Sequence, residues 1–388
     1  VRITTASHLV RRWDSGMSVS KIVAAAASSA GGAGLDVDEV FSTYLYEGNN
    51  GVLDITNNVD LTEKGLVWIK NRGSATPHLL WSSETTGNLN STNTDALNNA
   101  SLQPTFNNDG FTFPSSSWST LNASSNNYVS WTFRKAPKFF DVVTYTGNGT
   151  AGRQIAHNLG TTVGMLIVKR TNSSGDWSVF HRKLNGGTNS GNYRLELQGT
   201  VSESTTSHWN NTVPSSTTFT VGNSNTVNGN NNTYVAYLFA HNDSGDGEFG
   251  PDSDQDIIKC GSYTGNGSST GPSINLGFEP QWVMVKSATQ GGSDNDWYVV
   301  DTMRRFEALP QHDAGSQFLK WNTSDSEPSS GQAQRVAVNS TGFSPIGAST
   351  GWNINGQTYI YMAIRRGPLA APDDATKVFA MDTLGGTS

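Results

Sequence analysis

The sequence predicts an all-β protein of three tandem β-sandwich modules, of the jelly-roll or lectin-like kind, behind a short N-terminal leader. Three observations predict it. Only 15% of the 388 residues are charged, and the chain is rich in Ser, Thr, Asn and Gly, which disfavours long surface helices. Eleven Trp, eleven Tyr and sixteen Phe supply core material that a disordered chain lacks. Finally, one pattern of strands and turns recurs three times.

Each repeat is expected to open with a strand that ends in a tight hairpin turn. A tyrosine lies two residues before a Gly-Asn turn sequence, and Gly and Asn tolerate the positive φ that such turns require. The three tyrosines are Tyr46, Tyr145 and Tyr263. We therefore place the first strand of each module at these residues.

The second expected strand is a continuous apolar run that ends in lysine. The runs end at Lys70, Lys169 and Lys286. Counting from each tyrosine, the spacing is 24, 24 and 23 residues (46 to 70, 145 to 169 and 263 to 286). A run with no polar alternation is typical of a central strand that is covered on both faces.

Two further marks complete the repeat. A tryptophan follows the lysine, namely Trp81, Trp177 or Trp297. Near the end of each repeat, a short aromatic segment precedes a closing strand; these strands span 128–133, 234–239 and 359–364. Modules of about 100 to 120 residues fit two-sheet sandwiches with Greek-key or jelly-roll wiring.

Pro- and Gly-rich crossings divide the chain into modules at 40–136, 137–245 and 246–367. Residues 1–39 form the leader, partly helical or disordered. A short helix over 21–27 is one interpretation of it, and a signal peptide is the rival. Residues 368–388 look like the start of a further segment, and Met17 is a candidate start of the natural protein.

The composition also excludes several classes of protein. No apolar run of about 18 residues exists, so no helix is expected to span a membrane. The net charge of −7 and the lack of a basic stripe argue against a nucleic-acid partner. Cys260 is the only cysteine, which excludes a disulfide framework and a zinc site built on cysteine pairs. A strand-like context predicts that Cys260 is simply buried.

No catalytic constellation is evident, and we expect the protein not to be an enzyme. The seven histidines lack metal-ligand spacing, and His157 has no counterpart in the third repeat. A glycosidase needs two facing carboxylates, whereas the strand candidate at 193–197 carries only Glu196.

Two kinds of binding site remain open. Asp176-Trp177, Asp296-Trp297 and Trp81 offer rings and carboxylates that suit a sugar, yet a Trp present in every copy is also expected as a core residue. Asp252, Asp254 and Asp256 alternate as in calcium loops, although a solvated linker explains them too. No other cofactor is implied.

The repeated frame resembles a module of tailed bacteriophages. It consists of Tyr-x-Gly-Asn-Gly, His-Asn-Leu-Gly or Ile-Asn-Leu-Gly, a strand ending in Val-Lys, and Asp-Trp. It is similar to tandem modules in virion structural proteins and putative tail fibres of marine phages and cyanophages. The first copy departs from it, with 57–61 in place of the His-Asn-Leu-Gly element and no Asp before Trp81.

The resemblance implies a non-enzymatic tail fibre, spike or capsid-surface appendage on the virion surface. Its expected partners are other virion proteins, a host surface glycan or receptor, and further copies of the chain in a homotrimer. We expect the sandwiches to follow one another in a row, as a stiff shaft with exposed loops. The alternatives are a polysaccharide-degrading enzyme on a jelly roll, a cement or decoration protein, and a bacterial adhesin without glycan binding.

Overall fold

The computed structural model describes residues 34–98, 103–113, 121–292, 294–306, 317–328, 335–347 and 351–367. Their regular structure is almost entirely antiparallel β-sheet, which confirms the predicted all-β class. Among these described residues the one α-helix is α2 (Val37–Val40), whose first turn is capped by Asp36. The expectations for a helix over 21–27 and for 368–388 fall outside the described residues.

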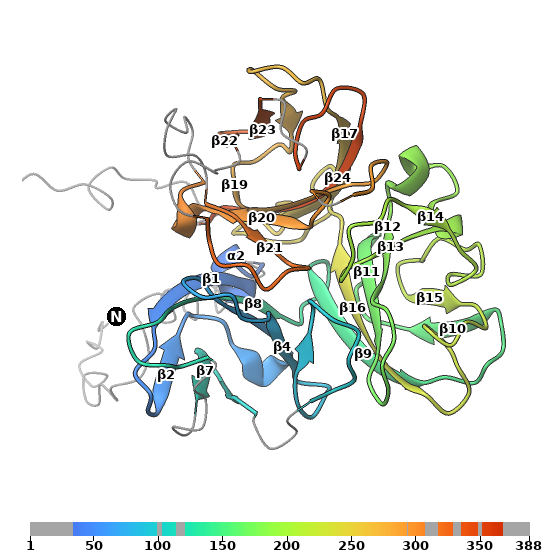
Figure 1. The fold of residues 1–388 in the computed structure, drawn as a ribbon, viewed down its shortest axis with the longest axis horizontal. Helices are drawn as coiled ribbons and strands as arrows, with labels where there is room; N and C mark the ends of the chain where they lie inside the picture. Colours follow the sequence, from blue (N-terminus) through green and yellow to red (C-terminus); the bar gives the residue numbers. More distant parts are fainter. Residues whose placement is uncertain are drawn as a thin grey trace, which may run out of the picture.

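The first module has a large and a small sheet (Figure 1). The large sheet has the order β1 (Phe41–Glu47), β8 (Asn127–Arg134), β3 (Gly65–Asn71), β4 (Leu79–Ser82) and β5 (Leu89–Asn90). The small sheet has the order β2 (Leu53–Thr56), β7 (Gly110–Phe113) and β6 (Thr105–Asn107). A 3-10 turn, η1 (Leu61–Glu63), precedes β3.

The second module repeats this wiring. Its large sheet has the order β14 (Ser204–Thr205), β13 (Tyr193–Glu196), β12 (Ser178–His181), β11 (Val163–Arg170), β16 (Thr233–Ala240) and β9 (Phe140–Thr146). Its small sheet pairs β10 (Arg153–Ala156) with β15 (Thr218–Val221). The 3-10 turns are η2 (Leu184–Gly187) and η3 (Ser190–Asn192).

The third module repeats it again. Its large sheet has the order β17 (Ile258–Thr264), β24 (Thr358–Arg365), β19 (Pro280–Ser287), β20 (Tyr298–Asp301) and β21 (Leu319–Lys320). Its small sheet has the order β18 (Ile274–Asn275), β23 (Gly342–Ile346) and β22 (Arg335–Asn339). A 3-10 turn, η4 (Thr302–Arg304), follows β20.

The strand that ends in lysine is central in each large sheet, as predicted. Every residue of β3 is buried, and in β11 and β19 only Arg170 and Gln281 are not. Each lysine strand has two neighbours in its sheet. One is the closing strand (β8, β16 or β24), and the other is the next strand along the chain (β4, β12 or β20). The continuous apolar pattern therefore reflects burial on both faces of the sheet.

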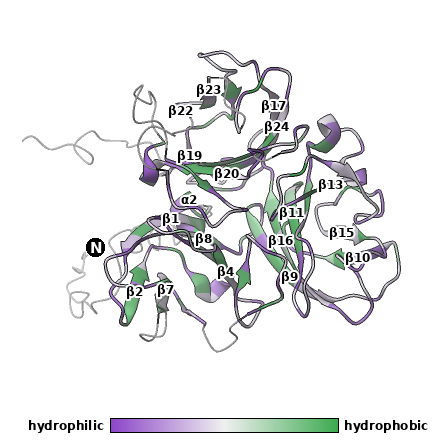
Figure 2. Ribbon diagram, viewed as in Figure 1, coloured by the Kyte–Doolittle hydropathy of each residue, from purple (hydrophilic) through white to green (hydrophobic). Residues whose placement is uncertain are grey.

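The three large sheets face one another around a common centre, and the small sheets lie outside (Figure 1). Phe133, Phe239 and Ile364 occupy the same register position in the three closing strands and belong to one shared core. The ring centroids of Phe133 and Phe239 are 5.4 Å apart. Figure 2 shows the hydrophobic strands β8, β11 and β16 gathered where the sheets meet. The expected row of separate sandwiches is therefore wrong.

The modules form a closed ring, because each lends a loop to its neighbour. The backbone N–H of Leu97, in the first module, donates to the carbonyl of Thr171 in the second at 3.0 Å. The same bond recurs from the second module to the third and from the third to the first: Glu203 to Ala288 at 2.7 Å and Glu327 to Arg72 at 2.8 Å. Each acceptor lies two residues after the strand lysine. The three modules therefore contact one another head to tail, and the third contact returns to the first module and closes the ring.

Candidate functional site

The Gly-Asn turns are fastened by a clasp that repeats in every module. Tyr145 stacks on Tyr234 at 5.1 Å, and its hydroxyl donates to the carbonyl of Val227 at 2.6 Å. Asn228, the next residue, donates from Nδ2 to Oδ1 of Asn148 at 3.1 Å. The equivalent residues of the first and third modules are Tyr46, Tyr128, Asn122 and Asn49, and Tyr263, Tyr359, Asn353 and Asn266.

The predicted positive φ is present at one position of each turn, at Asn50 (60°), Gly149 (70°) and Gly267 (63°). The expected hairpin is wrong, however. The strand after each turn joins the small sheet, so the turn carries the chain from one sheet to the other. The clasp asparagines Asn122, Asn228 and Asn353 were missed because their partners are more than 70 residues away.

Trp177 and Trp297 lie in the shared core and are fully buried. Their indole N–H groups donate across the ring, to the carbonyl of Asn93 at 2.9 Å and of Glu196 at 3.0 Å. A ring buried in this way offers no face to a sugar. The structure therefore gives these tryptophans the core role that the sequence had left open beside ligand binding.

Trp81 is not their counterpart. The register aligns Ser178 and Tyr298 with Leu79, so the preceding residue, His78, occupies the position of Trp177 and Trp297. Trp81 is buried in the separate inner core between the two sheets of the first module. Grouping the three tryptophans by their order after the lysine was wrong, because the first module has His78 at that position and its tryptophan lies three residues further along β4.

Asp176 and Asp296 hold loops in place. Gln198 donates to Oδ1 of Asp176 at 3.1 Å. Asn322 donates to Oδ1 of Asp296 at 2.6 Å, and Lys320 pairs with Asp296 at 2.8 Å. In both modules the same amide side chain also accepts the backbone N–H of the following tryptophan, at 2.9 Å. These carboxylates thus orient the strand that carries the buried indole.

The strand lysines are buried ammonium groups, which the sequence marked only as strand ends. Lys169 donates to the carbonyls of Thr94 and Gly175, and Lys286 to that of Asn295. Burial lowers the pKa of Lys70 and Lys169 to about 8 and that of Lys286 to about 7. Lys169 and Lys286 also lie 5.8 and 6.0 Å from the ring centroids of Trp177 and Trp297.

The joint between the third and first modules carries a buried ion network. Arg304 is paired with Asp301 at 2.6 Å and with Glu327 at 3.1 Å, and Glu327 also pairs with Arg72 of the first module at 2.8 Å. Trp131 of the first module donates to Asp301 at 3.1 Å. These bonds hold the third module against the first, although the two are far apart in the sequence.

The acidic stretch is part of the linker between the second and third modules. Asp256 pairs with Lys259 at 3.3 Å and accepts the N–H of Gly245 at 3.1 Å, while Asp252 and Asp254 are exposed. Among the described residues, no group of three or more His, Cys, Asp or Glu side chains has an arrangement that could hold a metal ion. The Asp256 carboxylate is therefore bound by Lys259 and Gly245 of the same chain.

His181, His208 and Cys260 are buried and His241 is half-buried, and each of these histidines is hydrogen-bonded within the chain. Burial lowers the pKa of His181 to about 3 and the pKa values of His208 and His241 to about 4. The pKa of the Cys260 thiol is raised by burial, so the thiol stays protonated and unreactive. Cys260 is buried, as predicted.

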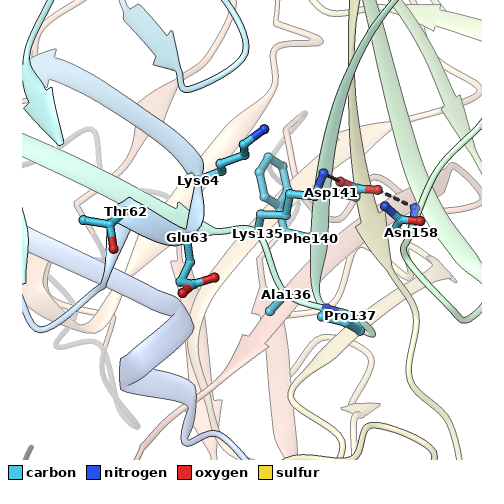
Figure 3. A pocket seen from close by; sticks show the side chains of 9 residues that line it. All are labelled: Thr62, Glu63, Lys64, Lys135, Ala136, Pro137, Phe140, Asp141 and Asn158. Atoms are coloured by element: carbon cyan, nitrogen blue, oxygen red, sulfur yellow. Dashed lines mark hydrogen bonds and ion pairs between the residues drawn. The ribbon is translucent and has the colours of Figure 1, made fainter. Parts of the chain in front are cut away.

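Two pockets lie at equivalent corners of the ring. The first, of about 400 Å³, is lined by residues from η1, the crossing after β8 and the start of β9 (Figure 3). There Asp141 pairs with Lys135 at 2.8 Å and accepts the N–H of Asn158 at 2.6 Å. The second pocket, of about 420 Å³, lies at the end of β24 and is lined by Gly277, Phe278, Glu279, Ser340, Arg365, Arg366 and Gly367.

The fold and site thus define an all-β ring protein with three equivalent modules. The chain belongs to a family described as a domain of unknown function (DUF7483), which matches residues 36–368. No curated protein matches the chain. Within the described part of the chain, no helix is long and apolar enough to cross a membrane.

Proposed function

We propose that the chain is a non-enzymatic structural protein of a bacteriophage virion, a tail fibre, spike or capsid-surface appendage that contacts the host surface. The observation that carries this proposal is the closed ring, in which each module lends a loop to the next. Such a ring is a rigid scaffold that presents its outer loops in fixed positions, which is what an attachment protein needs. The phage setting rests on the resemblance of the repeated motifs.

A passive role is supported by how the buried chemical groups are used. The strand lysines fasten loop carbonyls, and Asp141, the most buried carboxylate of the first pocket, is held by Lys135 and by a backbone N–H. A general acid or base must instead be free to reach a substrate proton.

Contact with host glycans would use hydrogen bonds rather than ring stacking. The described tryptophans are all buried, and the exposed large hydrophobic residues among the described ones are Val52, Val201, Val213 and Met303, none of them aromatic. Exposed loops such as Asn230 and Asn231 offer amides to sugar hydroxyls. The homotrimer rests on the resemblance alone.

Purified particles of the phage that carries the gene test the proposal. Mass spectrometry should find the chain in stoichiometric amount, and antibodies should label the particle surface. A chain that occurs in infected cells but not in purified particles would overturn the virion role. Release of reducing ends from host polysaccharide by the pure protein would overturn the non-enzymatic part. Decoration of particles without binding to host cells would favour the cement protein.

A further inference from the structure

The pocket at the end of β24 lies at a corner of the ring and is lined by Arg365. We propose that this pocket binds an oxyanion, a carboxylate, sulfate or phosphate group of a ligand, through Arg365. The site does not depend on the virion role. If that role holds, the oxyanion belongs to an acidic sugar of the host surface.

Arg365 is half-buried and lies against an aromatic ring. It is the last residue of β24, and its guanidinium carbon lies 6.0 Å from the ring centroid of Phe278. Among the described residues, no hydrogen bond or ion pair involves its guanidinium. Burial lowers the pKa of Arg365, because it outweighs the through-space attraction of Asp256 and Asp254. Such a group keeps five donors open, and an oxyanion can satisfy them in pairs.

The rest of the lining suits the same ligand. Among the described residues that line it, Glu279 is the only carboxylate, and it pairs with Arg366 at 2.5 Å, so its charge is already compensated. Arg366 is 58% exposed on its side chain and uses only Nη1 in that pair. The Ser340 hydroxyl is exposed and adds a donor. Among the described lining residues, Arg365 therefore carries the one positive charge that has no ion-pair partner.

The equivalent pocket, beside η1, contains a carboxylate that the pocket of Arg365 lacks. By strand register, Arg134 and Lys135 correspond to Arg365 and Arg366, and Lys64 corresponds to Glu279. In that pocket Asp141, the residue after Phe140 on the neighbouring module, supplies a carboxylate to Lys135. At the third corner the neighbouring module is the first one. Phe41 holds the position of Phe140 there and is followed by Ser42, which carries no charge.

At the corner between the second and third modules, the charge is also compensated by residues of the chain. Lys259 holds the register position of Asp141, and it pairs with Asp256 at 3.3 Å and with Asp243 at 3.6 Å. Two corners thus hold an ion pair at this register position, whereas the third has the uncharged Ser42 there and leaves the place to a ligand.

Titration of the full chain with sodium sulfate, sodium phosphate and sodium glucuronate tests the site, at an ionic strength held constant with sodium chloride. The readout is the side-chain Nε–H resonance of Arg365 by NMR. At least one anion should produce a saturable shift with a millimolar dissociation constant. The glucuronate arm separates a carboxylate ligand from a sulfate or phosphate ligand. No saturable shift with any of the three would overturn the proposal.

Variants locate the binding. R365Q should weaken it at least tenfold, and R365K should weaken it less because charge remains while the planar fork is lost. R153Q is the matched control, since Arg153 also lies over an aromatic ring, Tyr145 at 5.7 Å, but donates to the carbonyl of Thr146. R153Q should bind as the wild type does. Equal affinity of R365K, R365Q and wild type would overturn the site even if sulfate or glucuronate binds elsewhere.

Discussion

The indole N–H of Trp131 donates to Oδ2 of Asp301 at 3.1 Å, which joins two residues 170 positions apart in the chain. The same carboxylate oxygen accepts the guanidinium of Arg304, whose side chain is fully buried. One oxygen therefore links the third module to the first and compensates a buried charge. The closing joint of the ring depends on it.

Replacing Asp301 with alanine should destabilise the protein by about 3–5 kcal/mol, because among the described residues it leaves the buried Arg304 with Glu327 as its one charged partner. Urea unfolding measures the change. Glu84→Ala is the control, because the Lys64–Glu84 pair is on the surface and should contribute little to stability. Equal small losses in both variants would show that the network does not hold the ring.

The clasp asparagine of the second module, Asn228, should contribute as much to the free energy of unfolding as a core residue does. Asn228 is fully buried, and its Nδ2 donates to Asn148, Thr150 and Gly222. Asn228→Ala leaves those acceptors unsatisfied and should cost about 2–4 kcal/mol in the free energy of unfolding. The neighbouring exposed residue offers the comparison, since Asn230→Ala should change stability by less than about 0.5 kcal/mol.

Lys286 should make the protein more stable as the pH rises above neutrality. Its pKa is about 7 in the folded protein and 10.5 in the reference state, so the unfolded chain binds more protons between these values. The cost of burying the charge is complete below pH 7 and disappears towards pH 10.5. Relative to Lys286→Met, the wild type should gain up to about 1.4 kcal/mol per pH unit in this window. Parallel stability curves for the two proteins would contradict the lowered pKa.

His181 should contribute to acid denaturation. Its Nδ1 accepts the N–H of Lys183 and its Nε2 lies 3.1 Å from the carbonyl of Tyr361, an arrangement that fits the neutral ring. Because its pKa falls from 6.5 to about 3 on folding, its contribution is complete above pH 6.5 and is lost as the pH falls from there towards 3.

The comparison variant is His181→Gln, whose amide does not titrate. Thermal unfolding between pH 7 and about pH 4 should show the wild type losing up to about 1.4 kcal/mol per pH unit relative to that variant. A constant difference between the two proteins across this range would mean that His181 is not held neutral.

Much of the fold could be predicted because its signals are local or repeated. The apolar run before each lysine indicates a buried central strand whatever surrounds it, and the positive φ at Asn50, Gly149 and Gly267 follows from the residue types. The site was less predictable. Counting to the first tryptophan after each lysine paired Trp81 with Trp177, whereas strand register places His78 there.

The all-β class, the threefold repeat and the central strands can be predicted from the amino-acid order, because they depend on residue type and periodicity within a few dozen positions. The closure of the three modules into a ring, the burial of Trp177 and Trp297 at its centre, and the lack of an ion pair for Arg365 among the described residues became evident in three dimensions. These outcomes depend on which residues of different modules come to lie side by side. No local pattern in the chain encodes which carbonyl or carboxylate will come to lie opposite a given side chain.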